Sequence, residues 1–248
     1  MVYSAGKGVG VGEKSKRKKA PSKIRRTEKR RIAMKIAVIS DIHDNVWKLE
    51  AALSKIQEQN SDALICCGDL CSPFIVGLLK NGFSGPIHIV FGNNDADLFR
   101  ITQQAIPERV MFHGELAEFL LENERLLTRR ELMEREKADR FFDAAIAGKR
   151  IAVNHFNYLA RPMAASGKYE VVFYGHNHQH RHERLGEIDV INPGAIMGYN
   201  PSAQTEKTIA STFVIYDTTT GMAPSWYEIV TAQDVRAYHQ VAMEAFKL

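Results

Sequence analysis

Residues 35–45 read KIAVISDIHDN, a short apolar run that passes directly into acidic, imidazole and amide side chains. The β-branched residues at the start of this stretch predict a buried strand. Asp41 and His43 then stand just past the carboxyl end of that strand, where α/β sheets place their ligand crevice. The next two residues, Asp44-Asn45, can cap a helix that the apolar spacing predicts over about residues 46–57. The stretch therefore predicts a strand–loop–helix unit with candidate ligands in its loop.

The same arrangement recurs four times along the chain, each time with polar residues directly after a predicted strand. These are Gly68-Asp69 after 62–67, Gly92-Asn93 after 87–91, His155 after 150–154, and Gly175-His176-Asn177-His178 after 170–174. Loops held at the ends of a rigid sheet can converge on one point, so we expect these side chains to meet. A glycine before Asp69, Asn93 and His176 lets the backbone turn sharply and bring these ligands close.

Alternation of strands and helices over the first part of residues 34–248 predicts an α/β sheet with partly parallel strands. No linker divides this range, so we expect a single domain. Later predicted strands lack long crossover helices and are expected to form a largely antiparallel second sheet. The charged stretch 116–145 has few breakers and predicts a helical excursion of two helices. The other expected elements are a helix over 73–80, the later strands 170–174, 188–191, 211–217 and 225–230, and a closing helix over 231–246.

Residues 1–33 differ in charge from the rest of the chain, because they hold twelve Lys/Arg and two Glu, a net charge of +10. The remaining residues hold 21 Lys/Arg and 27 Asp/Glu, a net charge of −6. This basic tail has little apolar periodicity, so we expect it to be disordered. Two interpretations stay open: an electrostatic arm for nucleic acid or an acidic surface, or translation that starts at Met34.

The sequence does not predict a membrane protein, since no run approaches the roughly 20 apolar residues that a membrane helix needs. The three cysteines, Cys66, Cys67 and Cys71, are too few and too close together for a disulfide framework. Neighbouring residues on a strand point to opposite faces, so Cys66 and Cys67 are expected to pack in the core rather than share a metal. A reducing cytoplasm fits this use of cysteine.

The polar residues at the predicted strand ends form a candidate metal site. Oxygen and imidazole ligands without thiolate suit Mn, Fe, Zn, Ni or Co. Two such ions about 3.5–4 Å apart can hold a phosphoryl group, generate a hydroxide and stabilise the attacking and leaving oxygens. The candidate ligands are Asp41, His43, Asp69, Asn93, His155, His176 and His178.

In their order, the motifs D-x-H, G-D, G-N-x-D, H and G-H-x-H resemble the pattern of the calcineurin-like metallophosphoesterase superfamily. The stretches KIAVISDIHDN, GDL, GNND, YGHNH and INPGA are similar to its compact bacterial and archaeal phosphodiesterases. The resemblance implies a four-layer αββα sandwich of two mixed sheets flanked by helices. It also implies two divalent transition-metal ions, with Mn favoured, and a possible homodimer, since relatives of this type often form dimers.

The resemblance also assigns a role to each candidate ligand. One ion would take Asp41, His43 and His178, the other Asn93, His155 and His176, and Asp69 would bridge them. A hydroxide shared by the ions would attack phosphorus in line, while the metals and the Asn93 side chain stabilise the added negative charge. Asn93, Asp69 and His155 are the residues expected to act in catalysis itself.

Three positions beside the candidate ligands shape the expected chemistry. Asn94 stands where many superfamily members have a histidine that assists the leaving group, and an amide cannot donate a proton as a general acid. Compact relatives commonly read H-G-H where this chain has His155-Phe156-Asn157. Phe156 is therefore expected to narrow the pocket and change substrate choice. Asp95 is expected to orient a ligand or its loop rather than to do chemistry.

The function expected from these residues is hydrolysis of a phosphodiester, or of a phosphomonoester or nucleotide, in a small phosphorylated substrate. One alternative is a nuclease that uses the basic tail, although the rest of the chain carries a net charge of −6 and shows no basic groove. The other alternative is a protein-binding scaffold of the same fold that has lost its metals, although all seven ligand positions are filled in this chain.

Overall fold

The computed structural model describes residues 34–134, 148–201, 204, 207–219, 224–231 and 234 of the chain. The chain divides into two units, Met1–Arg31 and Ile32–Leu248, and the described residues all belong to the second unit. The basic tail, the end of the predicted 116–145 excursion and most of the predicted closing helix lie outside the described residues. None of the described helices combines the length and apolar character that a membrane crossing requires.

The first sheet contains the strand–loop–helix units that the sequence predicts. Its order is β12-β11-β1-β2-β3-β4, with β1 to β4 parallel to one another. β11 pairs antiparallel with β1, and β12 pairs antiparallel with β11. The strands are β1 (Lys35–Ile39), β2 (Ala63–Cys66), β3 (Ile87–Ile89), β4 (Val110–Phe112), β11 (Thr212–Asp217) and β12 (Ser225–Glu228).

The second sheet differs from the expected antiparallel sheet of late strands. Its order is β6-β5-β7-β8-β10-β9, and its centre, β7, β8 and β10, is parallel. The last two strands, β11 and β12, belong to the first sheet instead, because β11 pairs with the free edge of β1. The strands are β5 (Leu116–Glu122), β6 (Arg125–Thr128), β7 (Lys149–Asn154), β8 (Val171–Phe173), β9 (Arg181–Leu185) and β10 (Ile188–Asn192).

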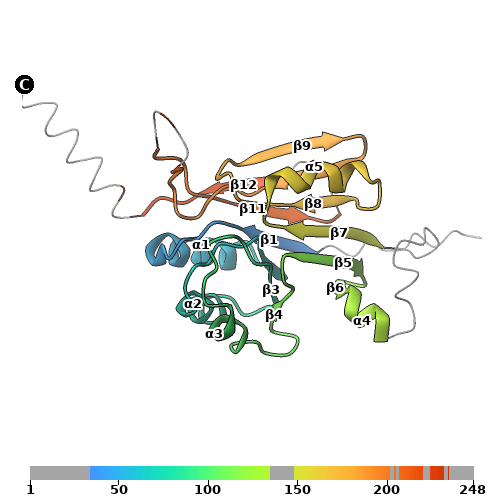
Figure 1. The fold of residues 1–248 in the computed structure, drawn as a ribbon, viewed down its shortest axis with the longest axis horizontal. Helices are drawn as coiled ribbons and strands as arrows, with labels where there is room; N and C mark the ends of the chain where they lie inside the picture. The colour runs from blue at the N-terminus through green and yellow to red at the C-terminus, as the bar shows by residue number, and fades with distance from the viewer. Residues whose placement is uncertain are drawn as a thin grey trace, which may run out of the picture. The chain divides into compact units, whose positions relative to one another are not determined.

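The described helices lie on the outer faces of the two sheets (Figure 1), so the unit has the expected four-layer αββα order. α1 (Val46–Glu58), α2 (Phe74–Gly82) and α3 (Leu98–Thr102) cover the first sheet, while α4 (Arg129–Glu134) and α5 (Asn157–Ala165) cover the second. α5 was not predicted, yet it is the crossover that makes β7 and β8 parallel. The fold class predicted from the sequence is therefore confirmed.

Burial on both faces explains the apolar strand that opens the domain. Ile36 and Val38 of β1 pack in the core between the two sheets. Ala37 and Ile39, on the other face, pack in the core beneath α1 and α2. A strand covered on both sides carries a continuous apolar run rather than an alternating one. The neighbouring cysteines of β2 and its loop divide in the same way, Cys66 into the helix-side core and Cys67 into the core between the sheets, as predicted.

The prediction of helix is wrong for residues 116–128, which form the hairpin β5–β6. Its two-residue turn, Asn123-Glu124, has φ values of 51° and 61°, the left-handed conformation of a type I′ turn. Phe119 faces the core between the sheets and Leu120 faces the opposite core. Because both faces are buried, the hairpin lacks the alternation of apolar and polar residues that marks a strand, and the apolar positions imitate helical spacing.

A buried histidine pair holds this hairpin's sheet to the first sheet. His88 Nδ1 of β3 lies 3.1 Å from His113 Nε2, and both rings pack edge-on against Phe119 of β5. Burial lowers the pKa of His88 to about 3 and that of His113 to about 4. Both rings are therefore neutral at pH 7, and their contacts with Phe119 serve the fold.

Candidate active site at the strand ends

The strand ends position all seven candidate residues at one edge of the sandwich. Asp41 and His43 follow β1, Asp69 follows β2, Asn93 follows β3, His155 follows β7, and His176 and His178 follow β8. Backbone hydrogen bonds join these loops, since the N–H of Asp41 donates to the carbonyl of Gly68 (3.1 Å) and the N–H of Gly175 donates to that of His155 (2.9 Å). The predicted convergence of the loops is therefore present.

Several candidate residues have a positive φ angle, a backbone conformation that residues other than glycine rarely adopt. Strain of this kind concentrates at functional sites, where the surrounding structure must enforce it. The positive φ values are 54° at Asp41, 45° at His43, 56° at Asp69, 75° at His176 and 57° at His178.

Asp41, His43 and His178 form the first group of candidate ligand atoms. The Nε2 atom of His178 lies 3.4 Å from Asp41 Oδ1, and the Nε2 atom of His43 lies 3.9 Å from the same oxygen. One ligand atom from each residue lies within 4.8 Å of the other two. Three donors at such spacing could hold one metal ion.

Asn93, His155 and His176 form the second group. Asn93 Oδ1 lies 3.1 Å from His155 Nε2 and 2.9 Å from His176 Nδ1, and the two ring nitrogens are 3.2 Å apart. The group combines one amide oxygen with two imidazoles, which is a donor set for a transition metal rather than for calcium or magnesium.

The Asp69 carboxylate lies between the two groups. Its Oδ2 atom is 3.4 Å from Nε2 of His43 in the first group and 3.3 Å from Nε2 of His155 in the second. Burial acts to raise the pKa of Asp69, but the neighbouring His155 ring and the hydrogen bonds donated by Asn94 outweigh it and hold the pKa below its ordinary value. The group is therefore an anion at neutral pH, and it lies between the two groups of candidate ligands.

In His155 and His178, a hydrogen bond at Nδ1 fixes the tautomer and the orientation of the ring. The Nδ1 atom of His155 lies 2.8 Å from the carbonyl oxygen of Cys67, and that of His178 contacts the carbonyl oxygen of Tyr199. A carbonyl only accepts, so Nδ1 carries the hydrogen in both rings and Nε2 is turned to the carboxylates. This is the arrangement of metal-binding histidines in proteins.

The His43 ring also supports a metal site. Its Nε2 atom is buried without a hydrogen-bond partner among the described residues. Burial lowers the pKa of His43, so the ring is neutral and Nε2 can offer a lone pair. An orphaned buried nitrogen is costly unless a ligand satisfies it, so the residues present fit a bound metal ion.

Two residues beside the ligands hold Asp69 and its loop. Asp95 accepts hydrogen bonds from the backbone N–H groups of Asp69 (3.0 Å), Leu70 (2.7 Å), Cys71 (3.0 Å) and Gly92 (2.7 Å). It therefore orients the loop, as predicted. Asn94 donates from its backbone N–H to Asp69 Oδ1 (2.9 Å) and from Nδ2 to Oδ2 (2.8 Å).

The structure corrects the role that the sequence suggested for Asp44. Asp44 does not cap α1, because Asn45 Oδ1 accepts from the Lys48 N–H (3.2 Å) and makes the cap alone. Asp44 instead accepts from the backbone N–H (2.9 Å) and hydroxyl (2.6 Å) of Ser72, joining the first two ligand loops.

Three further contacts that support the candidate site were not predicted, because they leave little signal in the sequence. Cys71 Sγ lies 3.5 Å from His43 Nδ1, and the Tyr199 contact to His178 uses a backbone carbonyl. Asn192 of INPGA donates from Nδ2 to the Gly175 carbonyl (3.1 Å) and to Asn177 Oδ1 (2.8 Å). This loop is therefore both a turn after β10 and a support for the Gly-His-x-His loop.

Gly92 provides the close approach that the sequence predicts before a ligand. A Cβ atom there would stand 2.2 Å from Asp69 Oδ1 and 2.8 Å from the Asp69 backbone nitrogen. We expect Gly92→Ala to lower the free energy of unfolding by about 1–3 kcal/mol, the usual cost of overpacking, and to weaken binding of Mn²⁺. Urea unfolding and metal content after dialysis against Mn²⁺ measure both effects.

Gly77→Ala in α2 is the matched control, since a Cβ atom there would meet nothing within 4 Å. We expect it to keep its metal and to match the wild type or gain about 0.5–1 kcal/mol of stability. If Gly92→Ala behaved like Gly77→Ala, the close packing of Asp69 on Gly92 would not be needed for the site.

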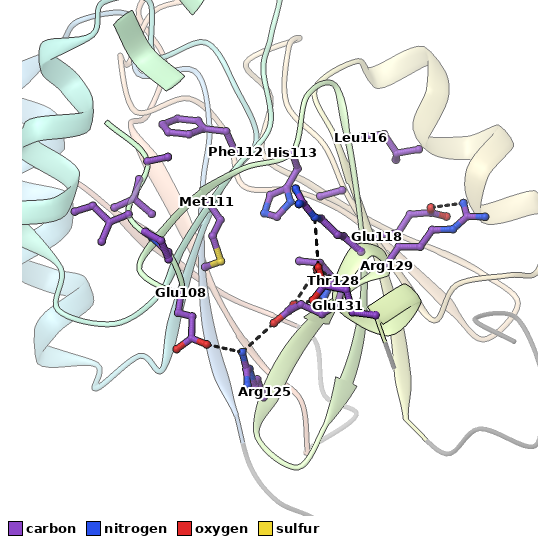
Figure 2. Close-up of a pocket in the computed structure, with 17 residues that line it drawn as sticks. Glu108, Met111, Phe112, His113, Leu116, Glu118, Arg125, Thr128, Arg129 and Glu131 are labelled. Atoms are coloured by element: carbon purple, nitrogen blue, oxygen red, sulfur yellow. Dashed lines mark hydrogen bonds and ion pairs between the residues drawn. The ribbon is translucent and has the colours of Figure 1, made fainter. Parts of the chain in front are cut away.

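A larger hollow, of about 820 Å³, lies beside β4, the β5–β6 hairpin and α4 (Figure 2) and includes none of the seven candidate residues. Its charged residues pair with one another. Arg125 Nη2 lies 2.9 Å from Glu131 Oε1 and 3.5 Å from Glu108 Oε1, and Arg129 Nη1 lies 3.0 Å from Glu118 Oε2. We therefore place the chemistry at the strand ends and not in this larger hollow.

The sequence profile of the calcineurin-like phosphoesterase superfamily domain matches residues 34–221, which contain every candidate ligand. The chain therefore belongs to the calcineurin-like phosphoesterase superfamily, a class of hydrolases that act on phosphoester bonds. This confirms the family that the five motifs predict.

Three relatives illustrate the likeness. A phosphodiesterase of Methanocaldococcus jannaschii is 27% identical over 168 residues, which cover 67% of this chain and 86% of the relative. The solved structure of an archaeal phosphodiesterase has a TM-score of 0.60 at 22% identity, over 79% of this chain and 100% of that one. The phosphoesterase Yfce from E. coli has a TM-score of 0.51 at 18% identity, again over 79% and 100%. The two structures show that the fold is shared.

Proposed function

We propose that the chain binds two divalent metal ions and hydrolyses a phosphodiester bond in a small substrate. The observation that supports this most strongly is the Asp69 carboxylate, whose Oδ2 lies 3.4 Å from His43 Nε2 and 3.3 Å from His155 Nε2. A single anionic oxygen facing both donor groups is what a ligand shared by two cations requires. The similarity to an archaeal phosphodiesterase favours a diester over a monoester.

We assign the candidate residues to the two ions in the way that the family resemblance implies. One ion would be held by Asp41, His43 and His178, the other by Asn93, His155 and His176, with Asp69 shared. When bound, the ions would supply a hydroxide for in-line attack and neutralise charge on the phosphoryl group. We favour Mn²⁺ among Mn, Fe, Ni, Zn and Co, all of which suit oxygen and imidazole donors.

The chain's own residues would orient the substrate and stabilise its charge. Asn93 turns Oδ1 toward the rings of His155 and His176, which leaves its Nδ2 group to donate to a phosphoryl oxygen. His155 is held by its Nδ1 hydrogen bond to the Cys67 carbonyl, and Asp69 by the amide of Asn94. Groups fixed in advance lose little free energy to reorganisation when the reaction occurs.

The finer expectations stay proposals. A cytoplasmic enzyme is supported by three free cysteines. The nuclease alternative depends on residues 1–33 and gains no support from the described residues. The scaffold alternative would leave the orphaned Nε2 of His43 unexplained, so we rank it below the enzyme. The homodimer stays a prediction from the family resemblance. The division into a tail (1–33) and a domain (34–248) stays a prediction from the charge and the apolar pattern of the sequence.

Removal and return of the metal tests this proposal. We expect chelation with EDTA to lower hydrolysis of bis(p-nitrophenyl) phosphate at least about 100-fold, and Mn²⁺ to restore it. Turnover of p-nitrophenyl phosphate, a monoester with the same leaving group, is expected to be slower. Circular dichroism before and after chelation controls for unfolding. A folded protein that binds no metal under Mn²⁺ or Ni²⁺ loading would instead favour the scaffold.

A further inference from the structure

A second, smaller hollow opens directly beside the candidate metal ligands. It has a volume of about 360 Å³, and His176 and His178 form part of its lining. Small-molecule sites span roughly 300–1,000 Å³, so the hollow has room for a compact organic group. A substrate whose phosphorus lies at the metal ligands would place one of its ester groups here.

The other side chains around this hollow are mostly carboxamides. Among the described residues that line it there is no Lys, Arg, Asp or Glu. An amide binds uncharged hydrogen-bonding groups and gives a second phosphate no counter-charge. The lining therefore favours a neutral group that both donates and accepts hydrogen bonds. The four carboxamides are those of Asn157, Asn177, Gln179 and Asn200.

Three of these amides keep hydrogen-bonding capacity for a ligand. The side-chain amides of Asn157 and Gln179 make no hydrogen bond within the described part of the chain, so each offers a donor and an acceptor. Asn177 Oδ1 already accepts from Asn192 Nδ2 (2.8 Å) and from the Gln179 N–H (3.3 Å). Its Nδ2 group is left as a donor.

Two aromatic rings, those of Phe156 and Tyr158, lie next to the His176 side of this hollow. The Phe156 ring lies 5.4 Å from that of His176, which lines the hollow, and 5.4 Å from that of Tyr158. Tyr158 is 63% exposed, although large aromatic side chains normally bury most of their area. Flat rings beside a metal site offer a surface on which a planar ligand can stack.

We propose that this hollow, together with Phe156 and Tyr158, binds the base of a nucleotide ester, so the substrate class is a nucleoside phosphodiester. The inference rests on the proposed function, because it assigns the substrate of the same site. Amides of Asn and Gln pair with the edge of a base, and aromatic side chains stack on its face. A sugar has no planar π face that could stack on the rings as a base does, so the comparison of the two decides the inference.

A pair of esters that differ only in the base tests the inference. The p-nitrophenyl ester of adenosine 5′-monophosphate is compared with that of ribose 5-phosphate, which has the same leaving group. We expect the Mn²⁺-loaded protein to prefer the nucleotide ester in kcat/KM on the order of 10- to 100-fold. Asn157→Ala and Tyr158→Ala are each expected to move this ratio toward one, while Gln103→Ala, an exposed carboxamide outside the hollow, keeps it.

Calorimetric binding of adenosine 5′-monophosphate and of ribose 5-phosphate gives a readout that needs no turnover, and we expect the same preference there. Equal rates and equal affinities for the two partners of each pair would overturn the base site and leave the proposed function standing. Equal losses on both esters in the variants would also overturn it, since the residues would then act on the site as a whole. Base-dependent binding without hydrolysis would support the base site and overturn the phosphodiesterase.

Discussion

Asp69→Asn is expected to lower kcat/KM for bis(p-nitrophenyl) phosphate on the order of 10³-fold or more, with a change in metal content from two ions to one or none. The substitution keeps the size of the side chain and removes its charge. Metal ions contribute several kcal/mol of charge stabilisation to phosphoryl transfer, and each 1.36 kcal/mol is about tenfold in rate. Asp69 Oδ2 lies 3.4 Å from His43 Nε2 and 3.3 Å from His155 Nε2, so both ions would depend on it.

Glu50→Gln is the control for this change, because it also neutralises one carboxylate but lies exposed on α1. We expect it to keep wild-type rates and both ions. Inductively coupled plasma mass spectrometry gives the metal content, and steady-state kinetics gives kcat/KM. An Asp69→Asn protein with two ions and normal turnover would show that the ligand assignment is wrong.

The second large effect concerns the leaving group. Asn94 cannot act as a general acid, and the structure shows its amide bound to Asp69 through Nδ2 (2.8 Å) and the backbone N–H (2.9 Å). A general acid typically contributes 10²- to 10⁴-fold, so we expect alkyl phosphodiesters to react slower than aryl ones by about that factor. The residue therefore positions Asp69, at the place where the family resemblance implies a proton donor.

A series of aryl and alkyl esters measures this dependence as the slope of log kcat/KM against the pKa of the leaving group. We expect a clearly negative slope, and a shallower one for Asn94→His, which restores a proton donor. Asn94→Ala is the matched variant without donor or ligand contact, and it is expected to lose rate on all esters alike. A flat slope in the wild type would show that another group protonates the leaving oxygen.

The site was predictable because its information is local. Each candidate ligand lies within a few residues of the strand that positions it, as His43 does after β1 and His155 after β7. Parallel strands place their carboxyl ends at one edge of the sheet, so no long-range information in the sequence is needed to bring these residues together. The contacts that were not predicted are long-range: the thiol of Cys71 against His43, and the backbone carbonyl of Tyr199 against His178. A carbonyl is present at every residue, so it leaves no mark in the sequence.

The fold was predictable where burial gives a distinct pattern and not elsewhere. β1 reads clearly as a strand because a polar loop ends its apolar run. The β5–β6 hairpin did not, because its turn, Asn123-Glu124, lacks the glycine common in such turns and both of its faces are buried. Strand pairing was also hidden, since β11 joins β1 across most of the chain length. Partner choice of this kind depends on the assembled core.

The proposed function depends above all on two metal ions that share Asp69. Crystals soaked in Mn²⁺ and measured for anomalous scattering test it most directly. We expect two peaks about 3.5–4 Å apart, with the Asp69 carboxylate between them. One peak would lie among Asp41, His43 and His178, and the other among Asn93, His155 and His176. A single peak, or two peaks with Asp69 bound to neither or to only one, would contradict it.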